Sequence, residues 1–358
     1  MSSSDLNVLF AEASALYDRN ELAKAGSLLE RVLAQDAAHI QARYKLGNVL
    51  KELGRLDEAS AQYRALLGRD PRHAETLNNL GAIYQAQDIP DAAETCYCQA
   101  MAYKPDLAPP YVNIGRIMQG QGRHEEAAQI YRKALQQGLD AELFGHLLSA
   151  LSGGGEGSGR APAGYVRETF DAFAAGFERR VVGELGYHVP ELLAALVRSQ
   201  GRSGLDVLDL GCGTGLVGTA LGPLARSLVG VDLSPRMLEE AARKGCYTAL
   251  HDADIAQWLA QAAPAGFDLV MAADVFIYIG DVQGVFREAR RVLRPGGLFA
   301  FSVEVCDQGD FQLQPTGRYA QSRAYVQGLA ASQGFKLLMS EAADVRSGIE
   351  GDLYLLGS

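Results

Sequence analysis

Residues 6–141 repeat with a period of 34, and this register restricts the fold more than any other feature of the chain. When the sequence is written in rows of 34, small and aromatic residues fall into fixed columns. These columns hold Ala13, Gly47, Gly81 and Gly115, then Ala25, Ala59, Ala93 and Ala127, then Leu29, Tyr63, Tyr97 and Tyr131. Each row predicts two amphipathic helices. We expect the small residues to allow close helix packing and the tyrosine to fill the next interface.

This pattern resembles the tetratricopeptide repeat family, with Pro71 and Pro105 closing the two middle repeats. The resemblance implies a groove on the first helix of each repeat, which is expected to bind a protein or peptide. The residues expected on this first-helix face are Gln41, Tyr44, Asn48, Lys51, Glu75, Asn78, Gln85 and Arg116. Tyr44, Pro109 and Asn113 stand where chaperone-binding relatives carry basic residues, so a chaperone tail is not expected. Packing on the second domain or on another copy, and hence a homo-oligomer, is the alternative.

The repeats end near residue 152. Residues 141–151 predict a final capping helix, and the glycine-rich run 153–159 is typical of a flexible linker. We therefore divide the chain into a helical repeat domain (1–152), a linker (153–161) and a second domain (162–358).

Composition excludes several classes of function. The net charge of −10 and the pI of about 5.2 argue against a nucleic-acid partner. The N-terminus lacks the pattern of a secretion signal, and no apolar run is long enough to cross a membrane, so a cytoplasmic protein is expected. The five cysteines have no zinc-ligand spacing, so no metal is expected.

The C-terminal half contains the run LDLGCGTG at residues 208–215, and Asp232 follows a second apolar strand. Strands alternating with helices predict a parallel sheet, and a glycine turn followed by an acid predicts a nucleotide pocket of the Rossmann type. The expected strands are 206–210, 227–232, 249–252, 267–272 and 297–303. Two later runs, 336–340 and 352–356, lack an intervening helix and are expected to pair antiparallel at the sheet edge.

Two nucleotides are compatible with this turn. Residues 213–218 match the dinucleotide fingerprint, but too few residues remain for a separate substrate domain of a dehydrogenase. Five motifs in order, LDLGCGTG, GVDLS, DADI, FDLVMAADV and LRPGG, resemble the class I S-adenosylmethionine-dependent methyltransferases. The combination also resembles bacterial predicted methyltransferases with tetratricopeptide repeats. The resemblance implies an all-α repeat solenoid followed by a Rossmann-like seven-stranded sheet, with S-adenosylmethionine as the cofactor.

The resemblance also implies which residues bind this cofactor. Asp209 and the turn glycines lie under its methionine and ribose parts, and Asp232 accepts the ribose hydroxyls. Asp254 accepts from the adenine amino group, although it fits a helix cap as well. The implied cofactor-binding residues are Asp209, Gly211, Gly213, Gly215, Asp232, Leu233, Met237, Asp254, Ile255 and Ala273.

The acceptor pocket is less well defined by sequence. Aromatic residues before the first strand resemble a lid over the cofactor, but they also fit an ordinary helix core. Arg318 fits either a clamp on an anionic acceptor or a surface ion pair. The candidate pocket residues are Tyr165, Phe170, Phe173, Tyr187, Arg318 and Tyr319, and the candidate bases are Asp274, Tyr278 and Glu304.

The sequence therefore predicts a methyltransferase whose repeats recruit a protein or peptide, with the acceptor and its reacting atom left open. One alternative is an interaction scaffold that binds the cofactor without catalysis. The other is a small-molecule methyltransferase whose repeats serve self-assembly.

Overall fold

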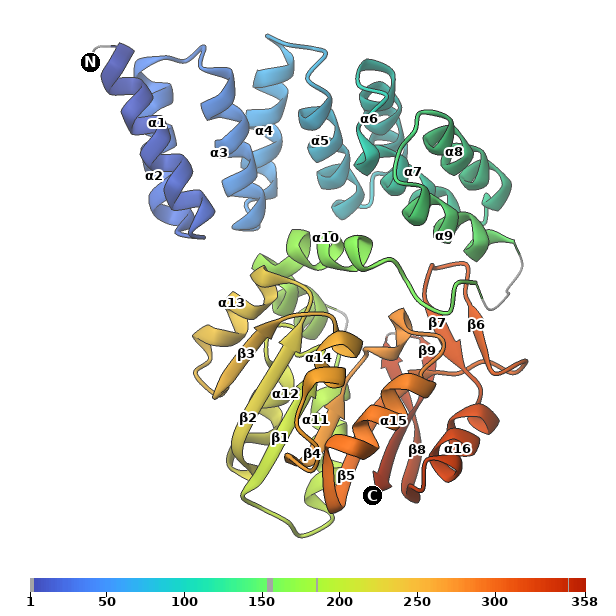
Figure 1. Ribbon diagram of the computed structural model, residues 1–358. Helices are drawn as coiled ribbons and strands as arrows, with labels where there is room; N and C mark the ends of the chain where they lie inside the picture. The colour runs from blue at the N-terminus through green and yellow to red at the C-terminus, as the bar shows by residue number, and fades with distance from the viewer. Residues whose placement is uncertain (1–2, 153–156, 185, 347) are drawn as a thin grey trace. The chain divides into compact units, whose positions relative to one another are not determined.

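The computed structural model describes residues 3–152, 157–184, 186–346 and 348–358 (Figure 1). The chain forms two compact units, Met1–Leu148 and Ser149–Ser358. Part of the predicted linker, residues 153–156, lies outside the described residues. Each unit is considered by itself below.

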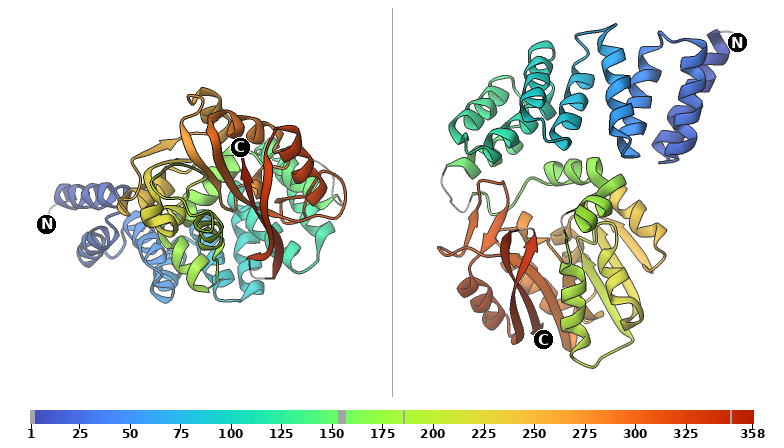
Figure 2. Two further views of the ribbon diagram at one scale, coloured as in Figure 1. Left: turned by 90° about the horizontal axis from the view of Figure 1, so that it is seen from below. Right: turned by 180° about the vertical axis from the view of Figure 1, so that it is seen from behind.

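The first unit is built from consecutive helix pairs, as the 34-residue period predicts (Figure 2). From the first helix to the eighth, each packs against the next along the chain, and the ring of Tyr131 lies 6.0 Å from that of Phe144 in the ninth. The helices are α1 (Ser3–Asp18), α2 (Leu22–Gln35), α3 (Ile40–Glu52), α4 (Leu56–Leu67), α5 (Ala74–Ala86), α6 (Pro90–Tyr103), α7 (Ala108–Gly120), α8 (His124–Gln136) and α9 (Ala141–Leu151). The last of these is the predicted capping helix.

Two histidines that occupy one column of the repeat start the first helices of two middle repeats. His39 Nδ1 accepts a hydrogen bond from the Ala42 amide, and His73 Nδ1 accepts one from the Thr76 amide, both at 3.2 Å. Side-chain acceptors at this position satisfy amide groups that the first helical turn leaves unpaired. The sequence period therefore fixes helix starts as well as helix packing.

The glycine column exists because a tyrosine ring occupies the adjacent space. Gly47, Gly81 and Gly115 lie against the rings of Tyr63, Tyr97 and Tyr131, each in the second helix of the same repeat. All three rings are fully buried. We expected the tyrosine to fill the interface with the following repeat. The structure places its ring first against the glycine of its own helix pair, because only a residue without a Cβ leaves room there.

Replacing Gly81 by alanine is therefore expected to destabilise the repeat unit. A Cβ at this position would lie 2.7 Å from Tyr97 Cε1, so the buried ring must move. Overpacking of this kind lowers the free energy of unfolding by about 1–3 kcal/mol. The matched control is Gly120→Ala in α7, where a Cβ meets nothing within 4 Å. Urea denaturation should show that the control is neutral or more stable by up to about 1 kcal/mol; equal effects of the two changes would contradict this packing argument.

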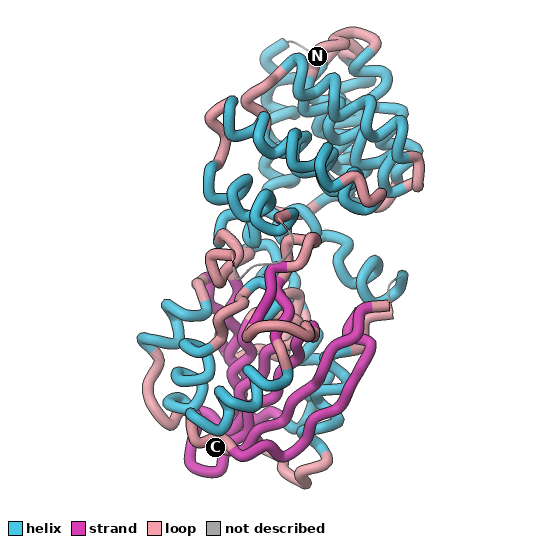
Figure 3. The backbone as a smooth tube through the Cα atoms, turned by 90° about the vertical axis from the view of Figure 1, so that its right-hand side faces the viewer, coloured by secondary structure: helices cyan, strands magenta, loops and turns pink. Residues whose placement is uncertain are grey.

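The second unit contains a seven-stranded sheet in the order β3-β2-β1-β4-β5-β9-β8. The first five strands are parallel, β9 is antiparallel to β5, and β8 is antiparallel to β9 at the edge. Figure 3 shows the long strands of this hairpin side by side. The strands are β1 (Leu205–Leu210), β2 (Ala225–Asp232), β3 (Ala249–Asp252), β4 (Phe267–Ala272), β5 (Leu293–Glu304), β8 (Lys336–Arg346) and β9 (Ile349–Gly357). The predicted solenoid followed by a Rossmann-like sheet is confirmed, and so is the antiparallel edge pair.

Helices cover both faces of the sheet, which explains why its central strands are mostly apolar. Apolar residues of α11 (Val189–Arg198) and α12 (Leu216–Leu221) pack on one face. The other face carries α14 (Ile255–Gln261), α15 (Gln283–Val292) and α16 (Arg323–Ser332). Helix α13 (Pro235–Arg243) contacts β2 and β3.

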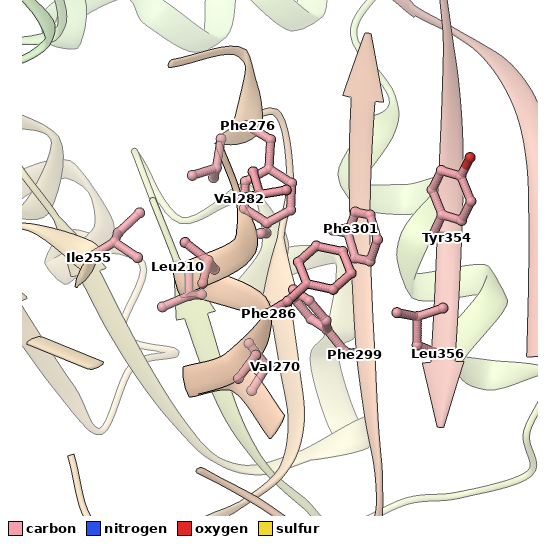
Figure 4. Packing of buried hydrophobic residues seen from close by; sticks show 14 of the residues in the cluster. Leu210, Ile255, Val270, Phe276, Val282, Phe286, Phe299, Phe301, Tyr354 and Leu356 are labelled. Carbon is pink, nitrogen blue, oxygen red and sulfur yellow. The ribbon is translucent and has the colours of Figure 1, made fainter. Parts of the chain in front are cut away.

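An aromatic cluster forms the centre of the core under α15 (Figure 4). The ring of Phe301 lies 4.7 Å from that of Phe299, 5.2 Å from Phe286, and is stacked on Tyr354 of β9 at 5.2 Å. These contacts join the parallel part of the sheet to the antiparallel hairpin. They hold the carboxyl ends of β4 and β5 in a fixed position, where the site described below is built.

The segment before the sheet folds onto the ends of the strands. It contains α10 (Ala163–Phe173), η1 (Ala174–Gly176) and η2 (Arg179–Glu184). The Ala161 amide donates to the Tyr278 carbonyl at 2.9 Å, and the Gly280 amide donates to the Gly159 carbonyl at 2.9 Å. The described end of the predicted linker is therefore hydrogen-bonded to η4 (Phe276–Tyr278) and the residues after it. A small sheet of β6 (Phe311–Leu313) and β7 (Tyr319–Gln321) completes the unit.

Candidate functional site

Three glycines with left-handed backbone form the turn after β1. Gly211, Gly213 and Gly215 have φ values of 65°, 51° and 87°, which only glycine adopts readily. A Cβ at Gly211 would lie 2.6 Å from Val275 Cγ2, whereas a Cβ at Gly213 would meet nothing within 4 Å. The turn is thus packed from below at Gly211 and open at Gly213. Backbone that borders open space in this way is what a ligand can approach closely.

Asp232, the last residue of β2, faces this turn. Its carboxylate accepts hydrogen bonds from the amides of Gly213 and Ser234, each at 2.8 Å. Burial raises the pKa of this carboxyl, and the amide hydrogen bonds act in the opposite direction. The two amides orient the carboxylate beside Gly213, and each carboxylate oxygen keeps further acceptor capacity for a ligand hydroxyl.

Asp209 lies within β1, directly below the turn, and is fully buried. Tyr247 donates its hydroxyl proton to Oδ2 at 2.7 Å. Oδ1 has no hydrogen-bond partner among the residues that the structure describes. Burial raises the pKa of Asp209 to about 7, and the nearby charge of Asp232 contributes. An unpaired buried carboxylate oxygen beside an open turn is suited to accept from a cationic group.

Met237 is fully buried in α13, and Leu233 is half-buried just before that helix. Leu233 follows Asp232 directly, and Met237 lies in the first turn and a half of the helix after it. Contact of either side chain with adenine stays a prediction.

Asp254 is already engaged in the structure. It is the N-cap of α14, where Oδ1 accepts from the amides of Ala256 at 2.9 Å and Gln257 at 3.1 Å. Oδ2 forms an ion pair with Arg160. The capping alternative raised by the sequence is thus present, and a role for Asp254 and Ile255 toward adenine stays a prediction.

Three residues of the segment before the sheet reach the same side of the site, and sequence analysis missed them. Arg160 pairs with Asp254, Arg167 pairs with Asp252 at 3.0 Å, and Asp171 accepts from Ser234 Oγ at 2.6 Å. We interpreted this stretch through its aromatic residues alone. The charge pattern was visible in the sequence, but the partners lie 63 to 94 residues away, beyond any local pattern.

The aromatic candidates of this segment divide into two groups. Tyr165 and Tyr187 are buried, and the ring of Phe170 lies 5.6 Å from that of Tyr278. Phe173 is 40% exposed. The structure therefore brings Phe170 and Tyr165 close to Tyr278 of η4, and Phe173 is the most exposed of the four.

The carboxyl ends of β4 and β5 bring two candidate bases together. Ala273 and Asp274 follow β4, and Asp274 has a left-handed φ of 61°, which is uncommon for residues other than glycine. Its amide donates to Ser302 Oγ of β5 at 2.8 Å. Asp274 forms an ion pair with Arg346, whose Nη1 lies 3.8 Å from Oε1 of Glu304. Arg346, at the end of β8, is a site residue that no motif indicated.

Tyr278 and Arg318 belong to the same neighbourhood. A hydrogen bond from Arg318 and the positive charges of Arg318 and Arg346 act on the pKa of Tyr278, which burial raises. Tyr319 is placed elsewhere: its ring packs 6.0 Å from that of Phe311, against Gly280, and its hydroxyl faces Ser158. The structure does not bring Tyr319 to the acid residues.

In the described part of the chain, no three His, Cys, Asp or Glu side chains are grouped so that they could hold a metal ion. None of the helices described has the length and apolar character that a membrane crossing requires.

Comparisons with known proteins agree with the two-part organisation. The family model described as "Methyltransferase domain" matches residues 208–301, and two tetratricopeptide repeat models match residues 16–82, 74–107 and 108–137. The chain thus carries tetratricopeptide repeats followed by a methyltransferase domain.

Among curated proteins, the chain is 30% identical over 112 residues to the ubiquinone biosynthesis O-methyltransferase of Idiomarina loihiensis, covering 29% of this chain and 44% of that protein. It is 35% identical over 142 residues to the malonyl-[acyl-carrier protein] O-methyltransferase of Hahella chejuensis, covering 37% and 47%. A solved structure similar to it is magnesium protoporphyrin IX methyltransferase from Synechocystis PCC 6803 with bound SAH. That match has 18% identity and a TM-score of 0.43, and covers 55% of this chain and 98% of the other. The chain spans less than half the length of the two curated relatives.

Proposed function

We propose that this chain, in which tetratricopeptide repeats precede a methyltransferase domain, transfers a methyl group from S-adenosylmethionine to an acceptor. The observation that carries the proposal is the open backbone at Gly213, with the Asp232 carboxylate on one side and the unpaired Asp209 oxygen below. A ligand with a ribose diol at one end and an ammonium at the other fits this donor and acceptor set. The curated relatives are methyltransferases, which supports the same reading.

We assign each part of the cofactor to the residues that can bind it. Asp232 accepts from the ribose hydroxyls, Asp209 Oδ1 accepts from the methionine ammonium, and Met237 and Leu233 supply apolar contact for the adenine. When bound, the cofactor supplies a methyl group on a sulfonium, which is a good leaving group. The protein then aligns the acceptor with that methyl group, and such alignment contributes a large part of the rate.

A nicotinamide dinucleotide is the competing ligand, because the turn also matches the dinucleotide fingerprint. Isothermal titration of the full-length chain with S-adenosylmethionine, S-adenosylhomocysteine and NAD separates the two. We expect binding of the first two and none of NAD. Binding of NAD alone would overturn the assignment of the pocket.

The repeats are proposed to recruit a protein or peptide through their first-helix face. Residues on α3, α5 and α7 meet across successive repeats, since Asn79 Nδ2 donates to Asn48 Oδ1 at 2.9 Å and Asn113 Nδ2 donates to Asn78 Oδ1 at 3.1 Å. Asn48 also accepts from the buried Tyr63 hydroxyl at 2.6 Å, so it contributes to folding. The half-buried pair Asn78 and Asn113 is therefore the better place to test recruitment.

The double change Asn78→Ala with Asn113→Ala is expected to leave cofactor affinity unchanged. With a macromolecular acceptor it should raise KM and spare kcat, because recruitment contacts contribute equally to the ground state and the transition state. The matched control is Gln99→Ala with Gln129→Ala on the exposed surface of α6 and α8. If both double variants have the same KM and kcat as the unchanged chain, the first-helix face does not recruit the acceptor. The face would then be assigned to self-assembly or domain packing.

A further inference from the structure

Three charged side chains converge where β4, β5 and β8 end, and we call Asp274, Glu304 and Arg346 the acceptor-side cluster. Asp274 is held by its amide bond to Ser302 Oγ and by its ion pair with Arg346. The side chains of Arg346, Asp274 and Glu304 are only 18%, 14% and 7% exposed. Burying charged side chains costs free energy. The burial of three charged groups at one position therefore requires an explanation.

Two atoms of this cluster remain without hydrogen bonds. Nη1 of Arg346 and Oε1 of Glu304 are both buried, and neither has a hydrogen-bond partner among the described residues. They form an ion pair at 3.8 Å, a distance that is too long for a hydrogen bond. Buried polar groups are nearly always satisfied, so an unpaired donor beside an unpaired acceptor points to a group that binds both.

The chemistry of the two atoms selects that group. It must accept from a guanidinium N–H and donate to a carboxylate oxygen, which a hydroxyl does with one oxygen atom. An ammonium is repelled by Arg346 and has no lone pair for it. A carboxylate is repelled by Glu304 and has no proton to donate. An ether or ester oxygen accepts only, and so leaves Glu304 unpaired.

The cluster also lies next to the cofactor turn. Val275, which follows Asp274, packs against Gly211 of that turn, where a Cβ at Gly211 would lie 2.6 Å from Val275 Cγ2. The charges of Asp274, Arg346 and Asp209 also act on the pKa of the buried Tyr187, which burial raises. Asp209 is the residue assigned above to the methionine ammonium. A hydroxyl held by the cluster is therefore adjacent to the methionine end of the bound cofactor, where the methyl group is.

We propose that the methyl acceptor is an acidic hydroxyl of the phenol or enol type, which Arg346 and Glu304 hold between them. The proposal rests on the proposed function and specifies its acceptor. The proton of the acceptor hydroxyl passes to Glu304, the oxygen forms the new bond to the methyl carbon, and the carbon–sulfur bond breaks. Arg346 holds the negative charge that develops on the oxygen, and the products are a methyl ether and S-adenosylhomocysteine.

The acidity of Glu304 agrees with this class of acceptor. Burial raises its pKa above the usual value, the charge of Asp274 acts in the same direction, and Arg318 and Arg346 oppose them. A base is most effective when its pKa lies near the working pH, so the raised pKa of Glu304 favours proton transfer. An aliphatic alcohol is much too weak an acid for a carboxylate base. Phenols and enols have the matching acidity.

The direct test uses 4-nitrophenol, whose phenolate is coloured, with the full-length chain saturated with S-adenosylhomocysteine. We expect binding with growth of the phenolate band at a pH below the pKa of the free probe. Arg346→Gln should raise the dissociation constant about tenfold or more, because a charge-assisted hydrogen bond is lost. The matched ligand 4-nitroanisole, which lacks the hydroxyl proton, should bind at least about tenfold more weakly than the phenol.

The base is tested separately with S-adenosylmethionine. Glu304→Gln should retain probe binding and lower methyl transfer to 4-nitrophenol by about 100-fold or more. It should also remove the acidic limb of the pH–rate profile, which a packing defect does not do. The control is Arg287→Gln on the exposed surface of α15, which should leave both quantities unchanged.

The outcomes separate this inference from the proposed function. A chain that does not bind S-adenosylhomocysteine contradicts the proposed function. A chain that binds it but neither binds nor methylates the phenol contradicts the acceptor assignment alone. Equal affinity for 4-nitroanisole, or unchanged phenol affinity in Arg346→Gln, would show that the cluster is a structural ion-pair network. Arg346→Lys serves as the second variant if the glutamine variant does not fold, and is expected to recover part of the affinity through its charge.

Discussion

Replacing Asp232 by alanine is expected to weaken S-adenosylmethionine binding by about two decades or more. The carboxylate is placed beside the open backbone of Gly213 by two amide hydrogen bonds, where it can accept from both ribose hydroxyls. A hydrogen bond to a charged group contributes about 1.5–3 kcal/mol, and about 1.4 kcal/mol corresponds to one decade. Isothermal titration of the full-length variant measures the change directly.

Asp232 also orients the glycine turn, so its removal acts in two ways. Asp232→Asn separates them, because the amide keeps one oxygen acceptor and nearly the same shape. We expect its affinity to lie between those of the unchanged chain and the alanine variant. Circular dichroism and the thermal midpoint without ligand confirm that each variant is folded. A loss of less than about threefold in a folded alanine variant would refute the ribose role.

The features that sequence patterns predicted are those with a local or periodic cause. Glycine and tyrosine, as at Gly81 and Tyr97, recur in fixed columns because the tyrosine ring packs against the glycine in each of these helix pairs. The strands were predicted because apolar runs end in a glycine turn or an acid. Strands β3 and β4 have the predicted bounds, and β5 is longer, since its pairing with β4 begins at Leu293 within the predicted turn.

What the patterns missed depends on contacts between distant parts of the chain. Arg346 pairs with Asp274 across 72 residues, and Arg160 pairs with Asp254 across 94. No period or motif relates these positions, because the contacts exist only after β8 and the segment before β1 have joined the sheet. Asp254 shows another limit, because its sequence position fits both a ligand contact and a helix cap. The structure shows the cap, and a contact with adenine stays a prediction.

Binding of S-adenosylhomocysteine is expected to weaken by up to about tenfold for each pH unit below 7. The pKa of Asp209 is raised to about 7 in the free protein because the carboxyl is fully buried. The ligand ammonium beside Oδ1 favours the ionised form, so below pH 7 binding must first remove a proton. Proton release is therefore coupled to binding below about pH 7, and the affinity becomes level above that pH.

The measurement is calorimetric titration at several pH values in two buffers of different ionisation enthalpy, which counts the protons released. Asp209→Asn is the control: it should bind more weakly at pH 8 and lose most of the pH dependence, since its amide does not ionise. The pH dependence of folding has the opposite sign to that of binding. An acid with a raised pKa in the folded state binds a proton that the unfolded chain has released above about pH 4. The unliganded protein should thus lose stability relative to Asp209→Asn as the pH rises from about 4 to 7. Equal pH dependence in the two proteins would place the titrating group elsewhere and remove Asp209 from the ammonium site.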